Sequence, residues 1–382
     1  MNPNNEKIKL LRDAKMSHVL LKLGLPTIIG MLINSLYSLV DAYFVGGLGT
    51  SQMGAVSIVF PITQVIIGLG MMFGSGAASY ISRLLGEGKD VQANKTASTA
   101  LITSLLVGAA SIGISLVFLG PLLTGLGATS TILPYAQNYA VIYIAGSIFN
   151  IFNVTMNNIV TAEGATKLTM IAMLTGAGLN AILDPVFIYT LGMGIEGAAI
   201  ASVVSQAITS LIYLWYILRK KGYLQLSAKL FTPNREIFGE VLKIGIPTFV
   251  FQLLSSVCIG LTNTAASGYG DSAVAAMGIV TRIMTLGTYV IFGYMKGFQP
   301  VAGYNYGAKQ YKRPREAIRL SLIWSTVFCC IVSAALLTFA PSVVPSFSQS
   351  DTVVLELGAT QLSVNDPGFP PNGSVFVHLC LF

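Results

Sequence analysis

Two acidic residues stand inside long apolar stretches of this 382-residue chain. Asp41 lies near the end of the first stretch, and Asp184 lies near the end of the fifth, directly before Pro185. An ionised carboxylate is costly in apolar surroundings, so each residue is a candidate for proton transfer or cation binding. Asn180 lies four residues before Asp184, which places both side chains on one face of a helix.

The apolar stretches are long enough to cross a membrane. Hydrophobic residues make up 53% of the chain and charged residues only 10%, too few charges for a water-soluble surface of this size. The composition predicts an all-α, polytopic membrane protein. Runs of about 20 apolar residues or more are found at 18–45, 53–80, 96–119, 134–161, 167–190, 196–218, 239–267, 273–306 and 317–341.

The chain also contains an internal repeat. The sequence KLGLPT at 22–27 recurs as KIGIPT at 243–248, an offset of 243 − 22 = 221 residues. With this offset, 15 of the 65 positions from 22 to 86 are identical, and the pairs include Gly76 with Gly297 and Gly86 with Gly307. Glycines and prolines dominate the shared positions, which indicates a common backbone path. Many transporters are built from two such repeated bundles.

The repeat predicts two pseudo-symmetric six-helix lobes, of which the second is incomplete. The partner of Asp184 would fall at 184 + 221 = 405, beyond Phe382, and Pro367, Pro370 and Pro371 cannot continue a lipid-exposed helix. We interpret the end as a truncated or frameshifted copy, with an authentic short variant as the alternative. The expected units are an N-terminal tail (1–16), a first lobe (17–221), a linker (222–237), about four helices of a second lobe (238–364) and an aberrant tail (365–382).

Basic residues predict the orientation in the membrane. Lys and Arg lie in the N-terminal tail and in alternate connections, whereas the connections between them contain none. By the positive-inside rule the N-terminus is then cytoplasmic. The net charge of +7 reflects this topology rather than affinity for nucleic acid, because the cations flank membrane spans. We expect a monomer in the plasma membrane of a prokaryote.

This topology brings five oxygen-bearing side chains to one depth near the outer surface. Asp41 lies about 6 Å and Asp184 about 9 Å below the outer ends of their helices, at 1.5 Å of rise per residue. We expect the layer to bind sodium or carry a proton. Its members are Asp41, Asn180, Asp184, Ser202 and Tyr139. Alternatively, Asp184 only satisfies the kink at Pro185 and Asp41 only caps its helix.

Further polar and soft residues lie deeper in the same lobe. They either line a substrate cavity or serve in helix packing and interhelical hydrogen bonds. These residues are Asn34, Tyr37, Asn153, Asn157 and Met173. Arg282 and Lys296, in the eighth span, face the bundle interior or snorkel to the surface, and the sequence assigns neither of them a role.

Several other classes of site are excluded by the residue patterns. The four cysteines and two histidines show no spacing of a metal centre or of a catalytic pair. The sequence has no GxxxxGK[ST] phosphate loop and no acidic cluster that would hold magnesium and a diphosphate. We therefore expect no cofactor, no metal beyond a possible sodium ion, and no enzymatic activity.

Four motifs resemble one transporter family. They are KLGLPT at 22–27, SRLLGEG at 82–88, NAILDPVFIYTLGMGIEGAAIAS at 180–202 and GFQPVAGYNYGAK at 297–309. Together the chain is similar to the multidrug and toxic compound extrusion (MATE) family over about residues 15–345, and most similar to its DinF-like branch. The resemblance implies a twelve-helix fold and export of drugs or metabolites in exchange for sodium ions or protons.

The family's coupling residues match this chain in the first lobe. The resemblance assigns Asp41, Asn180 and Asp184 to conserved positions of the family, and Ser202 to a position where the family often has threonine. Thr262 stands where the second copy would repeat Asp41, and Ser255 stands where another branch has glutamate. Coupling is therefore expected in the first lobe only.

The leading hypothesis is a cation-coupled antiporter that exports amphiphilic small molecules by alternating access. A flippase of lipid-linked sugars from the same superfamily is an alternative, for which several lumenal cations would be expected. An intramembrane enzyme would need a metal or nucleophile cluster, and a ligand-gated receptor would leave the duplication unexplained.

The topology can be tested by labelling introduced cysteines with a membrane-impermeant reagent. Cysteines at Thr50, Ala128 and Gly194 should react from outside the cell, whereas cysteines at Gly88 and Leu226 should not, because the basic loops stay inside. Labelling of the Gly88 position from outside would reverse the orientation.

Overall fold

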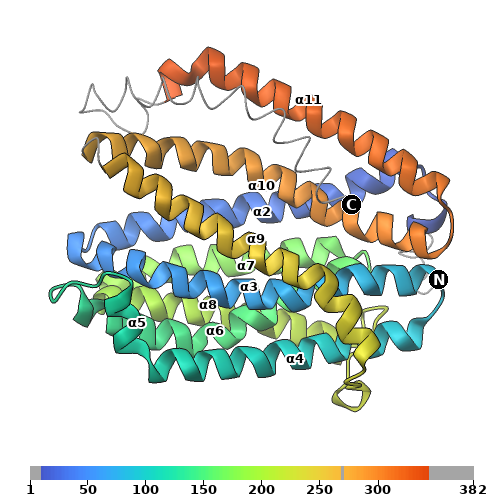
Figure 1. The fold of residues 1–382 in the computed structure, drawn as a ribbon, viewed down its shortest axis with the longest axis horizontal. Helices are drawn as coiled ribbons and strands as arrows, with labels where there is room; N and C mark the ends of the chain where they lie inside the picture. The colour runs from blue at the N-terminus through green and yellow to red at the C-terminus, as the bar shows by residue number, and fades with distance from the viewer. Residues whose placement is uncertain (1–9, 268–270, 344–382) are drawn as a thin grey trace.

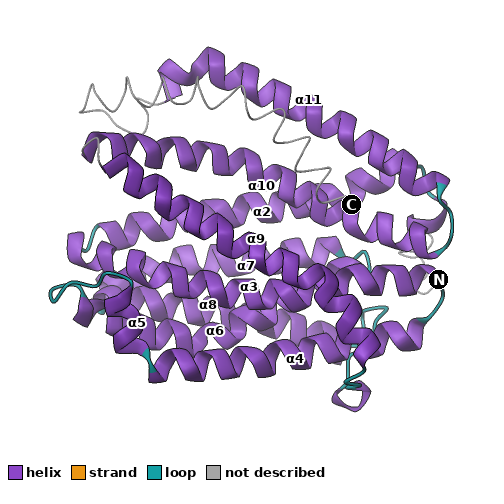
Figure 2. Cartoon of the chain, in the orientation of Figure 1, coloured by secondary structure: helices purple, strands orange, loops and turns teal. Residues whose placement is uncertain are grey.

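The structure is a computed structural model that describes residues 10–267 and 271–343. Every regular element in these two ranges is helical (Figure 2). The elements are α2 (Met16–Gly46), α3 (Thr50–Gly86), α4 (Asp90–Val117), α5 (Leu119–Gly125), α6 (Leu133–Ala162), α7 (Thr166–Pro185), η1 (Val186–Thr190), α8 (Gly194–Leu218), η2 (Ala228–Leu230), α9 (Arg235–Ser267), α10 (Asp271–Gly307) and α11 (Lys312–Val343).

Within the described ranges, seven helices are long and apolar enough to cross a membrane. They are α2, α3, α4, α6, the continuous α7–η1 helix, α8 and the first part of α9. Helices α10 and α11 follow the apolar runs expected at 273–306 and 317–341. The all-α membrane fold predicted from composition is thus confirmed.

The repeated PT motif lies inside a long helix in both copies. Pro26 is in α2 and Pro247 is in α9, and proline removes one hydrogen bond from each helix. The Thr27 hydroxyl donates to the carbonyl group three residues earlier (2.8 Å), and the Thr248 hydroxyl donates to the carbonyl group four residues earlier (2.9 Å). Such bonds keep backbone groups satisfied where no water is present, so the helices continue through the proline.

The helices form two groups that lie side by side (Figure 1). We call α2–α8 the first lobe and α9–α11 the second lobe. In the first lobe α2 packs on α7, α3 packs on α4 and α6, and α8 packs on α6 and α7. Between the lobes α3 packs on α9, and α10 packs on α2 and α3. The repeat relates α2 to α9 and α3 to α10, so the α3–α9 and α2–α10 contacts are equivalent.

Glycines allow two repeat-related backbones to touch where α3 and α10 cross. A methyl group added at Gly86 would overlap the carbonyl oxygen of Tyr304, and one added at Gly307 would overlap the carbonyl oxygen of Arg83. The two contacts are equivalent, because 304 − 83 and 307 − 86 both equal 221. The crossing therefore lies on the pseudo-twofold axis, and glycine is needed there because a Cβ atom does not fit.

Polar side chains tie the lobes together near the same crossing. The turns at 87–89 and 308–311 and the connection at 219–234 lie at this end of the bundle. We call it the basic end, because each of these segments contains lysine or arginine. Arg83 forms an ion pair with Glu240. Glu236 accepts hydrogen bonds from the Tyr80 hydroxyl (3.0 Å) and from the amide of Gln92 (3.1 Å). The first lobe thus supplies the donors, and α9 supplies two carboxylates.

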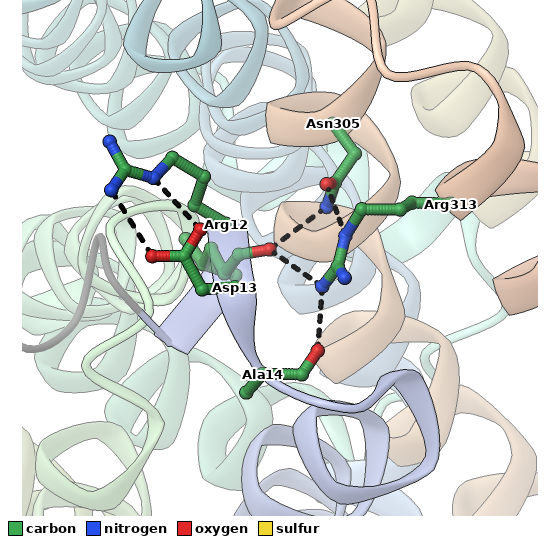
Figure 3. Close-up of polar contacts among 6 residues, drawn as sticks. Arg12, Asp13, Ala14, Asn305 and Arg313 are labelled. Atoms are coloured by element: carbon green, nitrogen blue, oxygen red, sulfur yellow. Dashed lines mark hydrogen bonds and ion pairs between the residues drawn. The ribbon is translucent and has the colours of Figure 1, made fainter.

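The segment before α2 adds another tie at the basic end (Figure 3). Arg313, in α11, donates to the carbonyl oxygens of Leu11 (3.3 Å) and Ala14 (2.8 Å), and to the side chain of Asn305 (2.9 Å). Asn305 also donates to Leu11 (3.2 Å), whose side chain is buried. Residues of the N-terminal tail are thus held by the second lobe.

The connection between the lobes is fixed to the first lobe. The backbone amides of residues 224, 225, 227 and 232 donate to side chains of α4 and of Glu163, at 2.8–3.2 Å. The Tyr223 hydroxyl donates to Asp90 (2.8 Å). Partial burial, together with this bond to a carboxylate, raises the pKa of Tyr223 to about 12, so the phenol remains a donor at physiological pH. Residues up to 232 therefore belong structurally with the first lobe.

Replacing Gly76 by alanine should weaken the contact between the lobes. The added methyl group would overlap the carbonyl oxygen of Val241 in α9, and overpacking typically costs about 1–3 kcal/mol. We expect the free energy of unfolding to fall by this amount, measured by thermal unfolding of the purified protein in detergent.

The matched control is Gly113→Ala in α4, where the added methyl group meets no atom within 4 Å. This variant should equal the wild type or exceed it by up to about 1 kcal/mol, because alanine favours helix over glycine. Wild-type stability of Gly76→Ala would show that the lobes do not pack at this position.

Candidate functional site

Asp184 lies where helix α7 changes its geometry. The α-helix ends at Pro185 and continues as the π-helix η1. Proline has no N–H to donate to the preceding turn, which favours the wider π geometry at this point. The Tyr189 hydroxyl of η1 donates to the carbonyl oxygen of Phe44 in α2 (2.7 Å). The kink expected at Pro185 is thus a π segment held against the end of α2.

The Asp184 carboxylate is buried without a hydrogen-bond partner. Its residue is 0% exposed, and neither carboxylate oxygen has a partner in the part of the chain that the structure describes. The Asn180 side-chain oxygen, one turn away on the same face, is also buried and without a partner there. Buried acceptors of this kind are costly unless a cation or a proton satisfies them.

Ser202 joins three helices next to these acceptors. Its hydroxyl oxygen accepts from the Asn180 amide (3.2 Å) and lies 3.3 Å from the Tyr37 hydroxyl. Ser202 is in α8, Asn180 is in α7 and Tyr37 is in α2. The Asn180 amide nitrogen is therefore engaged, which leaves its carbonyl oxygen as an acceptor.

Asp41 lies between the two ties that connect α2 with α8 and η1. It is one helical turn after Tyr37, which meets Ser202, and three residues before Phe44, which meets Tyr189. On the continuous α7–η1 helix, Asp184 lies between Asn180, which donates to Ser202, and Tyr189, which donates to Phe44. Helix α2 packs on α7. The structure thus brings Asp41, Asp184, Asn180 and Ser202 to one region of the first lobe.

Tyr139 is the fifth member of the predicted layer, and it comes from α6. It is buried in α6, where its ring stacks on Tyr143 with centroids 5.6 Å apart. It belongs to the apolar cluster that includes Val45 and Ile188. Among the described hydrogen bonds of the Ser202 cluster, none involves Tyr139.

The residues expected to line a substrate cavity lie in different surroundings. The Asn153 amide donates to the backbone carbonyl of Gln206 (2.8 Å), and the Asn157 amide donates to the Tyr213 hydroxyl (3.0 Å), so both asparagines connect α6 to α8. Asn34 is exposed on α2. Met173 packs against Gly30 between α7 and α2, and Tyr37 joins the Ser202 cluster described above.

Sequence reasoning missed two residues that organise the first lobe. Tyr189 anchors η1 to α2, but an apolar run gives no signal for a side-chain-to-backbone bond. Glu163, 1% exposed, accepts from the Tyr216 hydroxyl and from the backbone amide of Leu224. Only the fold shows that the connection between the lobes covers Glu163.

The arrangement fits a small hard cation or a proton rather than a transition metal. No group of three His, Cys, Asp or Glu that could hold a metal was found among the described residues. The oxygens of Asp184 and Asn180 are orphaned acceptors, and Ser202 and Asp41 can add further oxygens. Sodium takes oxygen ligands of this type, and an unpaired carboxylate can equally hold a proton.

The sequence matches the MatE family over residues 26–186 and 247–378. It is 29% identical over 372 residues to the multidrug export protein MepA of Staphylococcus haemolyticus (strain JCSC1435), covering 96% of this chain and 82% of that protein. MepA of Staphylococcus aureus (strain NCTC 8325 / PS 47) is also 29% identical, over 375 residues, with coverages of 98% and 82%.

Solved structures resemble the chain over nearly its whole length. One is described as the outward-facing conformation of a multidrug resistance MATE family transporter (TM-score 0.89, 30% identity). Another is a MOP superfamily transporter from Pyrococcus furiosus whose reverse polarity of binding pocket suggests a different function (TM-score 0.87, 30% identity). Each comparison covers 98% of this chain and 86% of the other.

Replacing Asp184 by asparagine should stabilise the protein, because the change keeps the shape and removes an unpaired buried charge. In sodium-free buffer at alkaline pH we expect the free energy of unfolding to rise by about 1 kcal/mol or more. Thermal unfolding in detergent measures the difference.

The difference should shrink as the pH is lowered, since protonation of the wild-type carboxylate removes the same charge. A variant less stable than the wild type at alkaline pH would mean that the carboxylate has a structural partner.

Proposed function

Since the chain belongs to the MatE family of multidrug efflux transporters, we propose that it exports amphiphilic drugs or metabolites in exchange for a coupling cation. It is a membrane protein, and its relatives and structural neighbours are transporters rather than enzymes. The coupling cation is sodium or a proton, and no cofactor is needed for exchange driven by an ion gradient.

The observation that carries this proposal is the buried, unpaired carboxylate of Asp184. A residue that serves structure alone would have its oxygens satisfied by the protein, because an unsatisfied charge costs free energy in a dehydrated site. Asp184 instead leaves both oxygens without partners among the described residues. Such a group suits a site that binds and releases a cation during each transport cycle.

The contacts between the lobes suggest the conformational state. The crossing of α3 and α10, the ion pair of Arg83 with Glu240 and the hydrogen bonds of Glu236 and Arg313 all lie at the basic end. If the basic end is cytoplasmic, these contacts close the inner side of the transporter. Alternating access then requires them to break while the lobes rock about the pseudo-twofold axis.

The chain is best placed in the plasma membrane of a prokaryote, as a monomer with a cytoplasmic N-terminus. The basic residues of the tail and of the loops support this orientation. A monomer is sufficient, because both lobes and the carboxylate site come from one chain. DinF-like membership remains a prediction, since the family match does not separate the branches.

The coupling role is tested by Asp41→Asn and Asp184→Asn. Each change preserves shape and removes the titrating charge, so gradient-driven export should fall to the background of protein-free vesicles while membrane insertion is kept. Export of a fluorescent amphiphile from proteoliposomes under an imposed sodium or proton gradient gives the measurement. Asp271→Asn, at the first residue of α10, is the control and should change little.

The same assay separates the two ions. Sodium needs Asn180 and Ser202 as neutral oxygen ligands, so alanine at either position should abolish sodium-driven export, whereas a proton carrier tolerates the loss. Wild-type export by both aspartate variants would mean that the carboxylates are structural.

A further inference from the structure

Lys296 is a cation within a membrane-spanning helix that the proposed coupling does not use. It lies 307 − 296 = 11 residues before the end of α10, about 16 Å of helix. That distance is longer than a lysine side chain, so its ammonium group cannot reach the membrane surface from there by snorkelling alone. The residue is half-buried, and none of the ion pairs found within 10–267 and 271–343 includes it.

The duplication places Lys296 beside the axis between the lobes. Its repeat partner is Ser75, since 75 + 221 = 296. Ser75 and Lys296 directly precede Gly76 and Gly297, and each of these glycines lies against a helix of the opposite lobe. Because the axis runs along the membrane normal, Ser75 and Lys296 lie at the same depth. One copy thus carries a serine at this place and the other carries a cation.

The face of α10 that carries Lys296 meets α3. Gln299 and Gly303, three and seven residues later, share this face of the helix. The Gln299 amide donates to the carbonyl oxygen of Ser75 (3.2 Å), and a Cβ added at Gly303 would lie 2.6 Å from the Ser82 Cβ atom. Lys296 therefore lies on the side of α10 that is turned to the first lobe.

Among the described residues, the hydrogen-bonding groups found at this depth of α3, α9 and α10 are polar and uncharged. The Ser75 hydroxyl lies 3.3 Å from the Thr248 hydroxyl of α9, and the Gln299 amide bridges to α3. Asp41 is much further toward the other end of the bundle. It lies 41 − 27 = 14 residues from Thr27, the repeat partner of Thr248, which corresponds to about 21 Å along the helix. The first-lobe carboxylates cannot neutralise the lysine from there.

We propose that Lys296 binds the anionic group, a phosphate or carboxylate, of an amphiphilic substrate at the seam between the lobes. An unpaired cation in dehydrated surroundings is costly unless an anion accompanies it. The coupling cation already neutralises the carboxylates of the first lobe, so the anion that Lys296 needs comes from the transported molecule. The second N–H of the Gln299 amide supplies a neutral hydrogen-bond donor for the same group, whereas the hydroxyls of Ser75 and Thr248 already donate to backbone carbonyls of their own helices.

This inference rests on the proposed export function and names the class of its substrate. The anionic group belongs either to a membrane lipid or to a free amphiphile, and the two sources share the same chemistry at Lys296. In both cases the apolar part of the molecule lies between helices whose remaining side chains are largely apolar.

The experiment compares two fluorescent ligands with the same dansyl-alkyl body, one ending in a phosphate and the other in a trimethylammonium group. Binding to the purified 382-residue chain in detergent is measured by fluorescence titration. Lys296→Gln should weaken binding of the phosphate ligand about tenfold or more, since bonds to charged groups are the strong ones. The affinity of this variant for the ammonium ligand should stay within about twofold of the wild-type value, because the ammonium group forms no ion pair with Lys296.

Lys296→Arg keeps the charge and should retain most of the phosphate affinity. Lys312→Gln removes an exposed cation at the start of α11 and should leave both affinities unchanged. In the wild type, the phosphate ligand should raise the melting temperature more than the ammonium ligand does. That measurement does not depend on the stability of any variant.

Repeating the titration in nanodiscs of phosphatidylglycerol or phosphatidylcholine identifies the source of the anion. Competition by phosphatidylglycerol alone assigns the site to a lipid phosphate, and equal binding in both lipids assigns it to a free amphiphile. If Lys296→Gln lowers the affinity for both ligands equally, or lowers neither affinity, the proposal is wrong. If the Asp41 and Asp184 variants still lose export in that case, the proposed function stands and only the role of Lys296 is wrong.

Discussion

The backbone contact between α3 and α10 is the constraint on which the arrangement of the lobes depends. Glycine at 86 and 307 lets each helix approach a carbonyl group of the other, and the two contacts are copies of one another. A side chain at either position would force the helices apart. The crossing holds the lobes together at the basic end, and the polar ties of Arg83, Glu236 and Arg313 lie at the same end.

Charge is distributed unequally between the duplicated halves. The first lobe holds the carboxylates of Asp41 and Asp184, and the second lobe has Thr262 in place of the first of them. The second lobe in turn carries Lys296 where the first lobe has Ser75. The proposed cation and substrate sites would thus lie on different lobes, about 20 Å apart along the helices, and we propose that movement of the lobes couples them. The connection up to residue 232 is bonded to the first lobe, so the proposed movement would have its hinge between Thr232 and the start of α9.

Much of the fold could be predicted from residue patterns, because the bilayer imposes a simple rule. Apolar runs of sufficient length must form helices there, since their backbone groups have no other partners. The connections were less predictable. The short helix α5 lies between α4 and α6, and the N-terminal tail is bonded to Arg313 and Asn305. Such bonds join residues about 300 positions apart, which no local pattern reveals.

The sequence by itself determined the helices, the duplication and the scarce ionisable residues within the spans, because hydropathy and repeat spacing act along the chain. It therefore pointed to one group of five residues, Asp41, Asn180, Asp184, Ser202 and Tyr139. Only the tertiary structure decided which of their atoms are engaged. The Ser202 hydroxyl accepts a hydrogen bond from the Asn180 amide and lies beside the Tyr37 hydroxyl, and the Tyr139 ring stacks on Tyr143. The Asp184 carboxylate has no hydrogen-bond partner among the described residues. The physical reason is that hydrogen bonding and burial depend on how helices rotate and pack against one another, and this geometry is set by contacts between residues far apart in the sequence.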